Sequence, residues 1–433
     1  MAKRWGIVVA VCALAAGACG NSTTDSSEAN GDEPVGPLGT VSAEDLTKNV
    51  PVDAPGVTDT AIKVGGVAST TNVLELQVDQ AFKGAQAYFD MVNSRGGIYG
   101  RQLELVAERD DQMVNNAAEV QGLISQDEVF AILPVATLLF GGAQTAADAG
   151  IPTFGWNINP EWGGPPNLFN EKGYICIDCA TPAQPWLAQE IGATKVGLLS
   201  YAVDQSADCA EGVKKSFEKW PTAELAYSDA VPYGATDLSV QVSKMREAGV
   251  DFVTTCMDAN GSVTLAKELK AQQLDIPQYM QNAYDQRLLD EFGDVLEGGY
   301  VLTIPASLEV PDPPEGLRNF KEWIAKVPGA EANELSLAGW LNADLFYRGL
   351  VGAGPEFSQA KVIAAINQME DWNADGIVPH VNWTFEHDEL RPESCGVISQ
   401  VQDGAFVPIF AEPGKPFTCT SNTADELVTE HRG

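Results

Sequence analysis

The architecture of this chain is set by residues 81–106, which read Ala81-Phe-Lys-Gly-Ala-Gln-Ala-Tyr-Phe-Asp-Met-Val-Asn-Ser-Arg-Gly-Gly-Ile-Tyr-Gly-Arg-Gln-Leu-Glu-Leu-Val106. The first half is amphipathic at helical spacing, and its apolar face consists of Phe82, Ala85, Tyr88, Phe89 and Val92. Glycines between positions 96 and 100 then end the helix, and residues 103–106 are typical of a strand. Because residues 62–67 are also strand-like, the region predicts a strand-helix-strand unit of a parallel sheet.

The same alternation repeats along the chain. Further strand-like and helical runs follow at 117–125, 130–133, 143–149 and 152–154. After a break rich in Gly and Pro at 162–166, the alternation restarts with runs at 195–200, 210–217, 225–227, 237–248, 251–255, 262–272 and 278–280. We therefore predict an α/β protein with two similar lobes, each a parallel-type sheet flanked by helices.

The C-terminal part has no third alternation of this kind. Longer helical patterns occur at 317–326, 335–351 and 358–369, and a β-rich, acidic end follows them. Since no separate core is indicated, we expect this part to complete both lobes. The predicted division gives residues 60–175 and about 298–350 to lobe 1, and about 176–297 and about 351–433 to lobe 2.

Composition and charge exclude several classes of protein. The chain has 433 residues, of which 45% are hydrophobic, so it has enough apolar material for a core and is not globally disordered. With 26 Lys+Arg against 60 Asp+Glu, its formal net charge is -34. This charge repels phosphate backbones and anionic lipid head groups, and we expect no nucleic-acid partner.

The N-terminus is typical of an export signal. Lys3 and Arg4 precede the apolar residues 7–15, which are too few to cross a bilayer, and Ala16-Gly-Ala-Cys19 follows. Ala16 and Ala18 suit ordinary signal cleavage, whereas a small residue directly before Cys19 suits a bacterial lipoprotein signal. Both interpretations remove residues 1–18, and the second adds a lipid to Cys19. Residues 19–59 are poor in apolar side chains and are predicted to form a flexible tether.

Six cysteines remain once Cys12 leaves with the signal and Cys19 is set aside. In an oxidising exported compartment we expect three disulfides among Cys176, Cys179, Cys209, Cys256, Cys395 and Cys419. The specific prediction is Cys395 with Cys419, because they flank a predicted hairpin of 397–402 and 405–410. Cys176-x-x-Cys179 also matches half of a zinc or redox motif, but no second such pair exists, which favours a structural disulfide. The other pairings stay open.

Residues 62–67, Gly84-Ala85, residues 92–106, Asp110-Asp111, residues 129–134 and Gly150-Ile-Pro152 form an ordered set of segments. Together with the export signal, this set resembles the solute-binding proteins of ABC importers, of the branched-chain amino-acid-binding type, over about Ile62 to Phe410. The resemblance implies a type I periplasmic-binding-protein fold, in which three crossings join two lobes that close over a ligand. Open α/β sheets independently place ligands outside the carboxyl ends of their strands.

Two loops of the first lobe carry candidate ligand contacts. Ala136 and Thr137 follow a buried strand and precede a helix expected from about Leu139, so this loop suits either a ligand carboxylate or a plain helix cap. The resemblance implies that a Ser or Thr here meets the ligand carboxylate. In the second loop, Trp156 departs from the small residues of the family and suits either a ligand or the core, while Asn157 and Asn159 supply amides.

The second lobe contributes the remaining candidates, which are Ser206, Asp258, Asn282, Tyr284 and Asp285. In family members that hold an amino acid, the resemblance implies an acidic residue after the fourth strand of this lobe, where it meets the ligand ammonium. That place falls near Ala283, with Asp285 two residues on, while Asp258 stands where the family often has an aromatic contact. Either aspartate is alternatively a solvated helix cap. Without an ammonium partner, a carboxylate or an amide becomes the more attractive ligand.

Catalysis has little support in the sequence. The G-x-S-x-G, H-E-x-x-H and G-x-x-x-x-G-K motifs are absent, and His387 between Glu386 and Asp388 is interpreted as part of a solvated charge cluster. We therefore expect no enzymatic activity, no cofactor and no metal.

The predicted function is that of an extracytoplasmic solute-binding protein. It is expected to capture a small organic ligand, which is an amino acid, an amide or an aromatic or aliphatic carboxylate, between its two lobes. It delivers this ligand to the permease subunits of an ABC importer at the outer face of the cytoplasmic membrane. We expect a monomer that meets the membrane only through its N-terminal lipid. The alternative is a lipid-tethered ligand sensor without a transport role.

Overall fold

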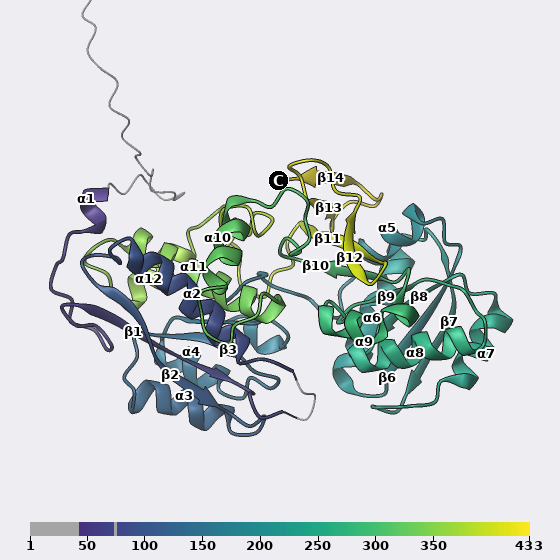
Figure 1. The fold of residues 1–433 in the computed structure, drawn as a ribbon, viewed down its shortest axis with the longest axis horizontal. Helices are drawn as coiled ribbons and strands as arrows, with labels where there is room; N and C mark the ends of the chain where they lie inside the picture. Colours follow the sequence, from purple (N-terminus) through teal and green to yellow (C-terminus); the bar gives the residue numbers. More distant parts are fainter. Residues whose placement is uncertain (1–42, 73–75) are drawn as a thin grey trace, which may run out of the picture. The chain divides into compact units, whose positions relative to one another are not determined.

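The computed structural model describes residues 43–72 and 76–433 (Figure 1). The predicted signal, residues 1–18, and the predicted lipid site, Cys19, lie outside the described residues. Within the described part, no helix has both the length and the apolar character that a membrane span requires.

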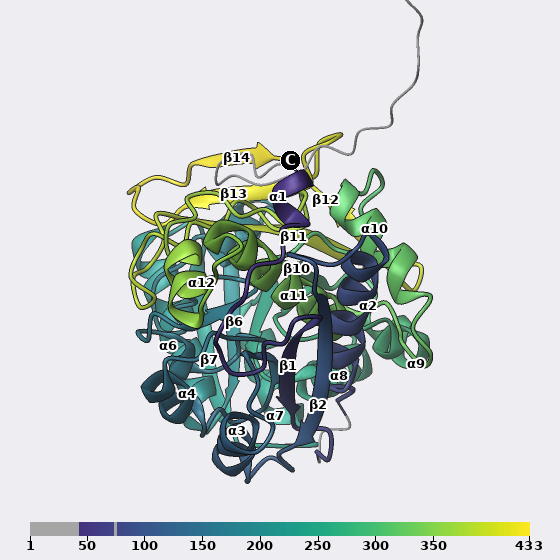
Figure 2. The ribbon, with the colours of Figure 1, turned by 90° about the vertical axis from the view of Figure 1, so that its left-hand side faces the viewer.

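The first sheet is five-stranded, parallel, and ordered β2-β1-β3-β4-β5. Its strands are β1 (Ala61–Ala68), β2 (Gln102–Asp110), β3 (Ala131–Ala136), β4 (Thr153–Gly155) and β5 (Leu168–Asn170). The helices from the same part of the chain are α1 (Ala43–Leu46), α2 (Gln80–Ser94), α3 (Asn116–Ser125), α4 (Ala143–Ala149) and the 3-10 turn η1 (Pro160–Trp162). The β1-α2-β2 unit confirms the unit predicted from residues 62–106. Figure 2 shows α2 on one side of β1 and β2, with α3 and α4 on the other.

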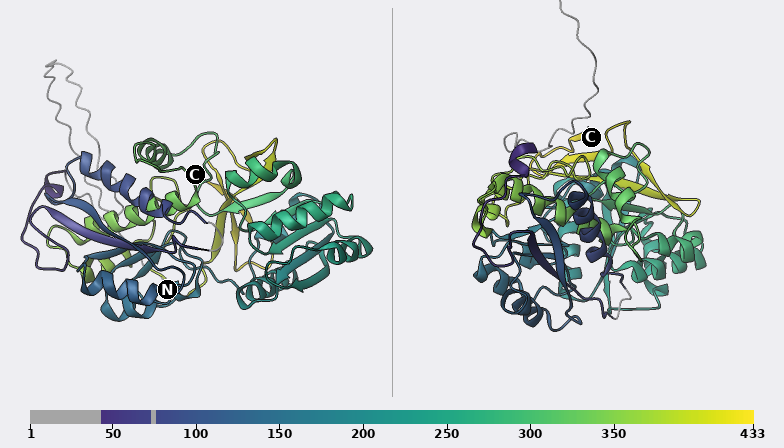
Figure 3. Two further views of the ribbon diagram at one scale, coloured as in Figure 1. Left: turned by 60° about the horizontal axis from the view of Figure 1, so that its bottom comes forward. Right: turned by 60° about the vertical axis from the view of Figure 1, so that its left-hand side comes forward.

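The second sheet is nine-stranded and mixed, ordered β14-β13-β11-β10-β9-β8-β6-β7, with β12 paired to β11. Its parallel part consists of β6 (Lys195–Tyr201), β7 (Glu224–Val231), β8 (Phe252–Cys256), β9 (Gln278–Met280) and β10 (Tyr300–Thr303). The antiparallel part consists of β11 (Glu393–Gln402), β12 (Ala405–Ile409), β13 (Phe417–Ser421) and β14 (Thr429–Arg432). The helices α5 (Ala183–Glu190), α6 (Asp204–Lys219), α7 (Ser239–Ala248), α8 (Ala259–Ala271) and α9 (Gln286–Leu296) alternate with the parallel strands. Figure 3 shows this sheet between its helices, and the α/β prediction is confirmed.

Three helices of the C-terminal half belong to the layer beside the first sheet. They are α10 (Glu315–Ile324), α11 (Glu334–Ala353) and α12 (Gln359–Ile366). Helix α11 packs on the sheet and on α2, α10 packs on α2, and α12 packs on α11. A Cβ atom on Gly84 of α2 would overlap the carbonyl oxygen of Ser336, and one on Gly339 of α11 would overlap that of Ala81. Glycine at these two positions therefore lets α2 and α11 touch backbone to backbone, and their Tyr88 and Trp340 rings meet edge-on at 4.9 Å between centroids.

The boundary between the lobes differs from the division expected near residues 298 and 350. β10 belongs to the nine-stranded sheet, whereas α12 and the buried Trp372 and Trp383 share one core with α2 and α11. Val362 and Ile366 of α12 lie over Gly349 of α11, which leaves room for them. We therefore propose that residues from about 304 to 383 belong to lobe 1, and that the chain returns to lobe 2 just before β11.

The prediction of a flexible tether over residues 19–59 is wrong for its last part, residues 46–59. Leu46, Val52, Ala54 and Val57 pack against the core of the first lobe. The buried guanidinium of Arg101 donates to the carbonyl oxygens of Val50 at 2.8 Å, Thr58 at 2.7 Å and Tyr99 at 3.1 Å. A few spaced apolar residues and one buried arginine therefore hold this polar segment against the lobe.

Three disulfides occur in the part of the chain that the structure describes. The predicted pair Cys395–Cys419 is confirmed, with the two residues directly opposite each other in the antiparallel β11–β13 ladder. The predicted hairpin forms between β11 and β12, but it does not itself bring the two cysteines together. They meet because β13 pairs with the first part of β11. The pairings left open are Cys176–Cys179 within one loop and Cys209–Cys256 between α6 and β8.

Candidate ligand-binding site

The predicted contacts all follow carboxyl ends of parallel strands. Ala136 is the last residue of β3, Trp156 directly follows β4, and Asp258 follows β8 by two residues. Thr137 follows β3, Asn157 and Asn159 follow β4, and Asn282, Tyr284 and Asp285 follow β9, each in the connection after its strand. Ser206 lies in the first turn of α6, the helix that follows β6. In each sheet the carboxyl ends of parallel neighbours meet at one edge, where ligands of open α/β folds bind.

Thr137 is buried and already has polar partners. Its hydroxyl donates to the carboxylate of Asp111 and lies 3.2 Å from the hydroxyl of Ser69. Asp111 also accepts from the side chain of Asn116 at 2.8 Å. The helix expected from about Leu139 begins only at Ala143, so Thr137 is not its cap. A ligand carboxylate at this hydroxyl would have to compete with Asp111 for its single proton.

The loop after β4 is held mainly by its two asparagines. The amide of Asn157 donates to Gly173 O at 2.9 Å, and that of Asn159 donates to Thr137 O at 3.2 Å. Trp156 is half-buried and packs against the cluster that contains Phe82, but its indole N–H has no hydrogen-bond partner among the described residues. Among the three predicted side chains of this loop, Trp156 thus has an unpaired donor, which is shielded from solvent in this structure.

Sequence reasoning missed a charged group after β5. Glu171 is 1% exposed, and one of its carboxylate oxygens lacks a hydrogen-bond partner in the described part of the chain. The ammonium of Lys172 lies 3.5 Å from Glu171 and 3.3 Å from Glu334. Burial raises the pKa of Glu171; burial also opposes the charge of Lys172, but Glu334 and Glu171 outweigh it and raise the pKa of Lys172. The sequence signal was that Glu171-Lys172 follows the short run Leu168-Phe169-Asn170 that forms β5.

The two aspartates of the second lobe are helix caps. Asp258 accepts from the N–H of Gly261 at 2.8 Å and from the hydroxyl of Tyr201 at 2.8 Å. Asp285 accepts from the N–H of Arg287 at 2.9 Å and forms an ion pair with the same side chain. Burial, and then the hydrogen bond to Asp258, raises the pKa of Tyr201. Both carboxylates therefore already have partners within the second lobe, which makes a further contact with a ligand ammonium less favourable.

Tyr284 connects the loop after β9 to the crossing between β10 and α10. Its hydroxyl donates to Glu309 at 2.7 Å and accepts from the N–H of Leu308 at 2.8 Å. Asn282 donates to Met257 O at 3.2 Å, and Ser206 lies half-buried in the first turn of α6. Movement of the second lobe relative to this crossing would therefore change the hydrogen bonds of Tyr284.

The prediction that His387 belongs to a solvated charge cluster is wrong. Its imidazole is 5% exposed, with Nδ1 2.9 Å from Leu168 O and Nε2 3.0 Å from the side-chain oxygen of Asn367. The neighbouring acids in the sequence do not keep the ring in water, because Phe169 and Trp383 enclose it.

Comparison with known proteins gives a consistent result. The periplasmic binding protein family model matches residues 61–405. The Leu/Ile/Val-binding protein homolog 7 of Brucella suis is 24% identical over 390 residues, which cover 83% of this chain and 93% of that protein.

Two solved structures share the fold. The fatty acid ABC transporter substrate-binding protein of Thermomonospora curvata aligns with a TM-score of 0.67 at 19% identity, over 85% of this chain and 94% of that one. An ABC transporter solute-binding protein of R. palustris in complex with 4-hydroxybenzoate aligns with a TM-score of 0.65 at 19% identity, over 80% and 95%. These structures show the type I arrangement of two lobes that the strand order of this chain also has. Because the family model spans most of its length, the chain belongs to the periplasmic binding protein family.

Proposed function

We propose that this protein captures a small organic ligand between its two lobes and delivers it to the permease subunits of an ABC importer. The observation that carries the proposal is that loops at the carboxyl ends of both sheets bear the available polar groups, while three crossings join the sheets. A ligand that touches both lobes only when they are closed stabilises the closed state, which a permease can then distinguish from the open one.

The ligand class that we favour is an aromatic or aliphatic carboxylate or an amide, with an amino acid as the broader family expectation. Asp258 and Asp285 are both satisfied within their own lobe, so neither is poised for a ligand ammonium. Trp156 offers an aromatic face and an indole N–H that has no hydrogen-bond partner among the described residues. The relatives that bind a fatty acid or 4-hydroxybenzoate are consistent with a carboxylate.

We further propose an exported monomer, attached through a lipid on Cys19 to the outer face of the cytoplasmic membrane. Family membership implies an extracytoplasmic location. The alternative, a lipid-tethered sensor without a transport role, uses the same lobes and the same closure. Importer genes adjacent to the gene for this protein would favour transport, and a neighbouring signalling receptor would favour the sensor.

The proposal is tested first by a ligand screen. Thermal-shift measurements across amino acids, amides, aromatic acids and fatty acids should show stabilisation by one chemical class. Small-angle scattering with the best ligand should then show compaction, because closure reduces the radius of gyration. Stabilisation by a ligand without any compaction would contradict capture between the lobes.

A second test concerns the indole of Trp156. Trp156→Phe keeps an aromatic ring but removes the N–H, and we expect the affinity for the best ligand to fall by about tenfold. Trp323→Phe is the matched control, since Trp323 is a half-buried tryptophan of α10, outside the loops of the candidate site. Equal affinity of the two variants by calorimetry would remove Trp156 from the site.

A further inference from the structure

A cavity of about 520 Å³ lies where the three crossings meet the second lobe. The crossings are the segments between β5 and α5, between β10 and α10, and between α12 and β11. The first contributes Tyr174 and Ile177, the second contributes Ile304, and the third contributes Phe385. The opposite wall includes Trp186 of α5, and residues of α6, β9 and β11 complete it. None of the ten predicted ligand contacts lines this cavity, although Lys172, which follows β5, borders it. Its volume falls within the range that binds small organic molecules.

The wall of this cavity is covalently braced. Cys176, Cys179, Cys209 and Cys395 all line it, and each is in a disulfide. The loop that holds Cys176 and Cys179 is further fixed to α6, because Lys215 donates to Asp178 O at 2.9 Å. A chamber with these constraints keeps its shape without an occupant, which lowers the entropy cost of binding.

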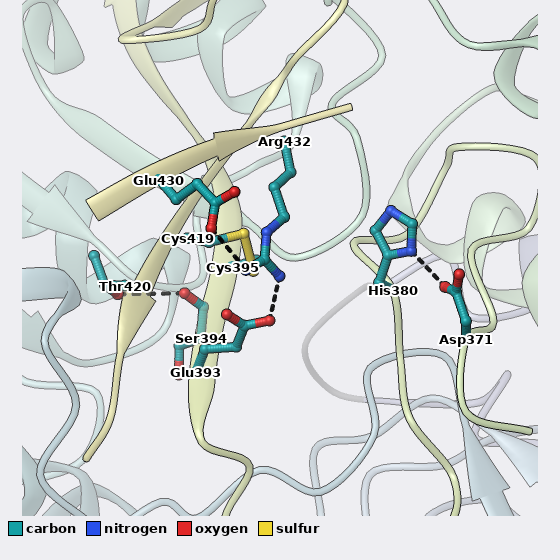
Figure 4. A network of polar contacts seen from close by, with 9 residues as sticks. All are labelled: Asp371, His380, Glu393, Ser394, Cys395, Cys419, Thr420, Glu430 and Arg432. Carbon is teal, nitrogen blue, oxygen red and sulfur yellow. Dashed lines mark hydrogen bonds and ion pairs between the residues drawn. A yellow bond between two sulfur atoms is a disulfide. The ribbon is translucent and has the colours of Figure 1, made fainter. Parts of the chain in front are cut away.

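The charged groups around the cavity are mostly neutralised by neighbours. Figure 4 shows Glu393 with Arg432 on one side and His380 with Asp371 on the other. Lys172 is paired with Glu171 and Glu334. Glu370 is exposed to solvent at the outside. The lining charge that remains to be accounted for is Arg391.

Arg391 is a partly buried cation that forms no salt bridge within the described residues, and the acid that acts on it at longer range is Glu389. Its guanidinium lies 5.0 Å from the centre of the Phe385 ring, and Nη1 donates to the carbonyl oxygens of Glu386 and Glu389. Nε and Nη2 have no hydrogen-bond partner among the described residues. These two nitrogens form the edge of a guanidinium that binds a carboxylate in bidentate fashion. Both are shielded from solvent, so the side chain must turn toward the cavity to use them.

We propose that the hinge cavity is a second binding site, which takes an amphipathic monocarboxylate with its apolar body among Ile177, Trp186 and Ile304 and its carboxylate on Arg391. Aromatic and aliphatic walls favour the apolar body. The anion supplies the charge partner that a partly buried guanidinium lacks. Because the walls come from all three crossings, the occupant contacts the segments that bend when the lobes move.

The test uses octanoate and 1-octanol, which differ in charge but share the alkyl chain, with calorimetry on the disulfide-intact protein. We expect octanoate to bind about tenfold or more tightly than octanol, and Arg391→Gln to remove this difference without weakening octanol. Arg246→Gln, which changes an exposed arginine of α7, is the matched control and should change neither affinity. Octanoate should also alter the fluorescence of Trp186, and Trp186→Phe should abolish that change.

A cavity-filling variant separates this site from the candidate ligand site. Ile304→Trp should block both probes, while Trp156→Ala should leave both bound; circular dichroism and the thermal midpoint check that each variant is folded. The proposal is overturned if octanoate does not bind, or if Arg391→Gln binds octanoate as the unchanged protein does. It is also overturned if Trp156→Ala, but not Ile304→Trp, removes octanoate binding, because the probe then lies in the candidate ligand site. If octanoate does not bind in this cavity, the proposed function can still be tested by the compaction of the protein with its best ligand.

Discussion

The imidazole of His387 packs edge-on against the rings of Phe169 and Trp383, with centroids 5.2 Å apart in both pairs. Burial, which disfavours the charged ring, lowers the pKa of His387 to about 4. In the unfolded chain the same ring takes up a proton near its ordinary pKa of about 6.5. Between these values the unfolded state binds more protons, so stability falls as the pH is lowered through this window.

The corresponding prediction is a pH-dependent loss of stability. From about pH 6.5 down to about pH 4, we expect His387 to reduce the free energy of unfolding by about 3 kcal/mol. His387→Leu removes the titrating group and should flatten this part of the profile, as measured by urea unfolding at each pH. His431→Leu, on the terminal strand β14, is the control. A profile that His387→Leu leaves as steep as before would contradict the burial argument.

At the same scale, the candidate site shows how hydrogen bonding limits a side chain. Thr137 is predicted from its position after β3, and it lies there, but its hydroxyl donates to Asp111. Two carboxylates that share one hydroxyl would repel each other. We therefore propose that a ligand carboxylate lies nearer to Trp156 than to Thr137.

Helix α2 and helix α11 illustrate how a single atom decides the packing of an element. At Gly339, any side chain would overlap the backbone of α2. We expect Gly339→Ala to reduce the free energy of unfolding by about 2 kcal/mol, because the helices must separate. Gly293→Ala on α9 is the control, since its nearest neighbour is 3.5 Å from the added Cβ, and alanine favours a helix by up to about 1 kcal/mol. Chemical denaturation measures both, and equal effects would contradict the close approach.

The segment 46–59 is another element whose order depends on a distant residue. Arg101 supplies the donors for the carbonyl oxygens of Val50 and Thr58. Arg101→Met keeps most of the apolar volume but removes these donors, so we expect faster amide hydrogen exchange in residues 46–59 and little change in β6–β9. Arg95→Met, at the exposed end of α2, is the matched control. Unchanged exchange in Arg101→Met would mean that Leu46, Val52, Ala54 and Val57 suffice to hold the segment.

At the scale of the whole molecule, the net charge of -34 acts against compactness. Like charges on a closed surface repel, and salt screens them over about 10 Å at 0.1 M. We expect the thermal midpoint to rise when sodium chloride is increased from about 0.01 M to about 0.2 M. Sodium sulfate at equal ionic strength gives a larger rise through preferential exclusion, which separates screening from salting-out. A midpoint that falls with sodium chloride would show that attractive ion pairs dominate.

The α/β class, the two lobes and the strand ends could be predicted because they depend on local periodicity. The alternation in residues 62–106 needs only neighbours in the chain to be recognised, and β1, α2 and β2 formed where it indicated. The cysteine pair 395–419 followed in the same way from a local β pattern, although a third strand made the contact.

The sequence by itself determined which segments become strands and helices and at which strand ends polar groups lie. Only the tertiary structure decided what those groups meet: Asp111 for Thr137, Tyr201 for Asp258, and Glu334 for Lys172. It also decided the burial of His387 and the packing of α10, α11 and α12 into one core with α2. The physical reason is that hydrogen bonding, desolvation and close packing depend on atoms far apart in the chain, whereas backbone periodicity is expressed within a few residues.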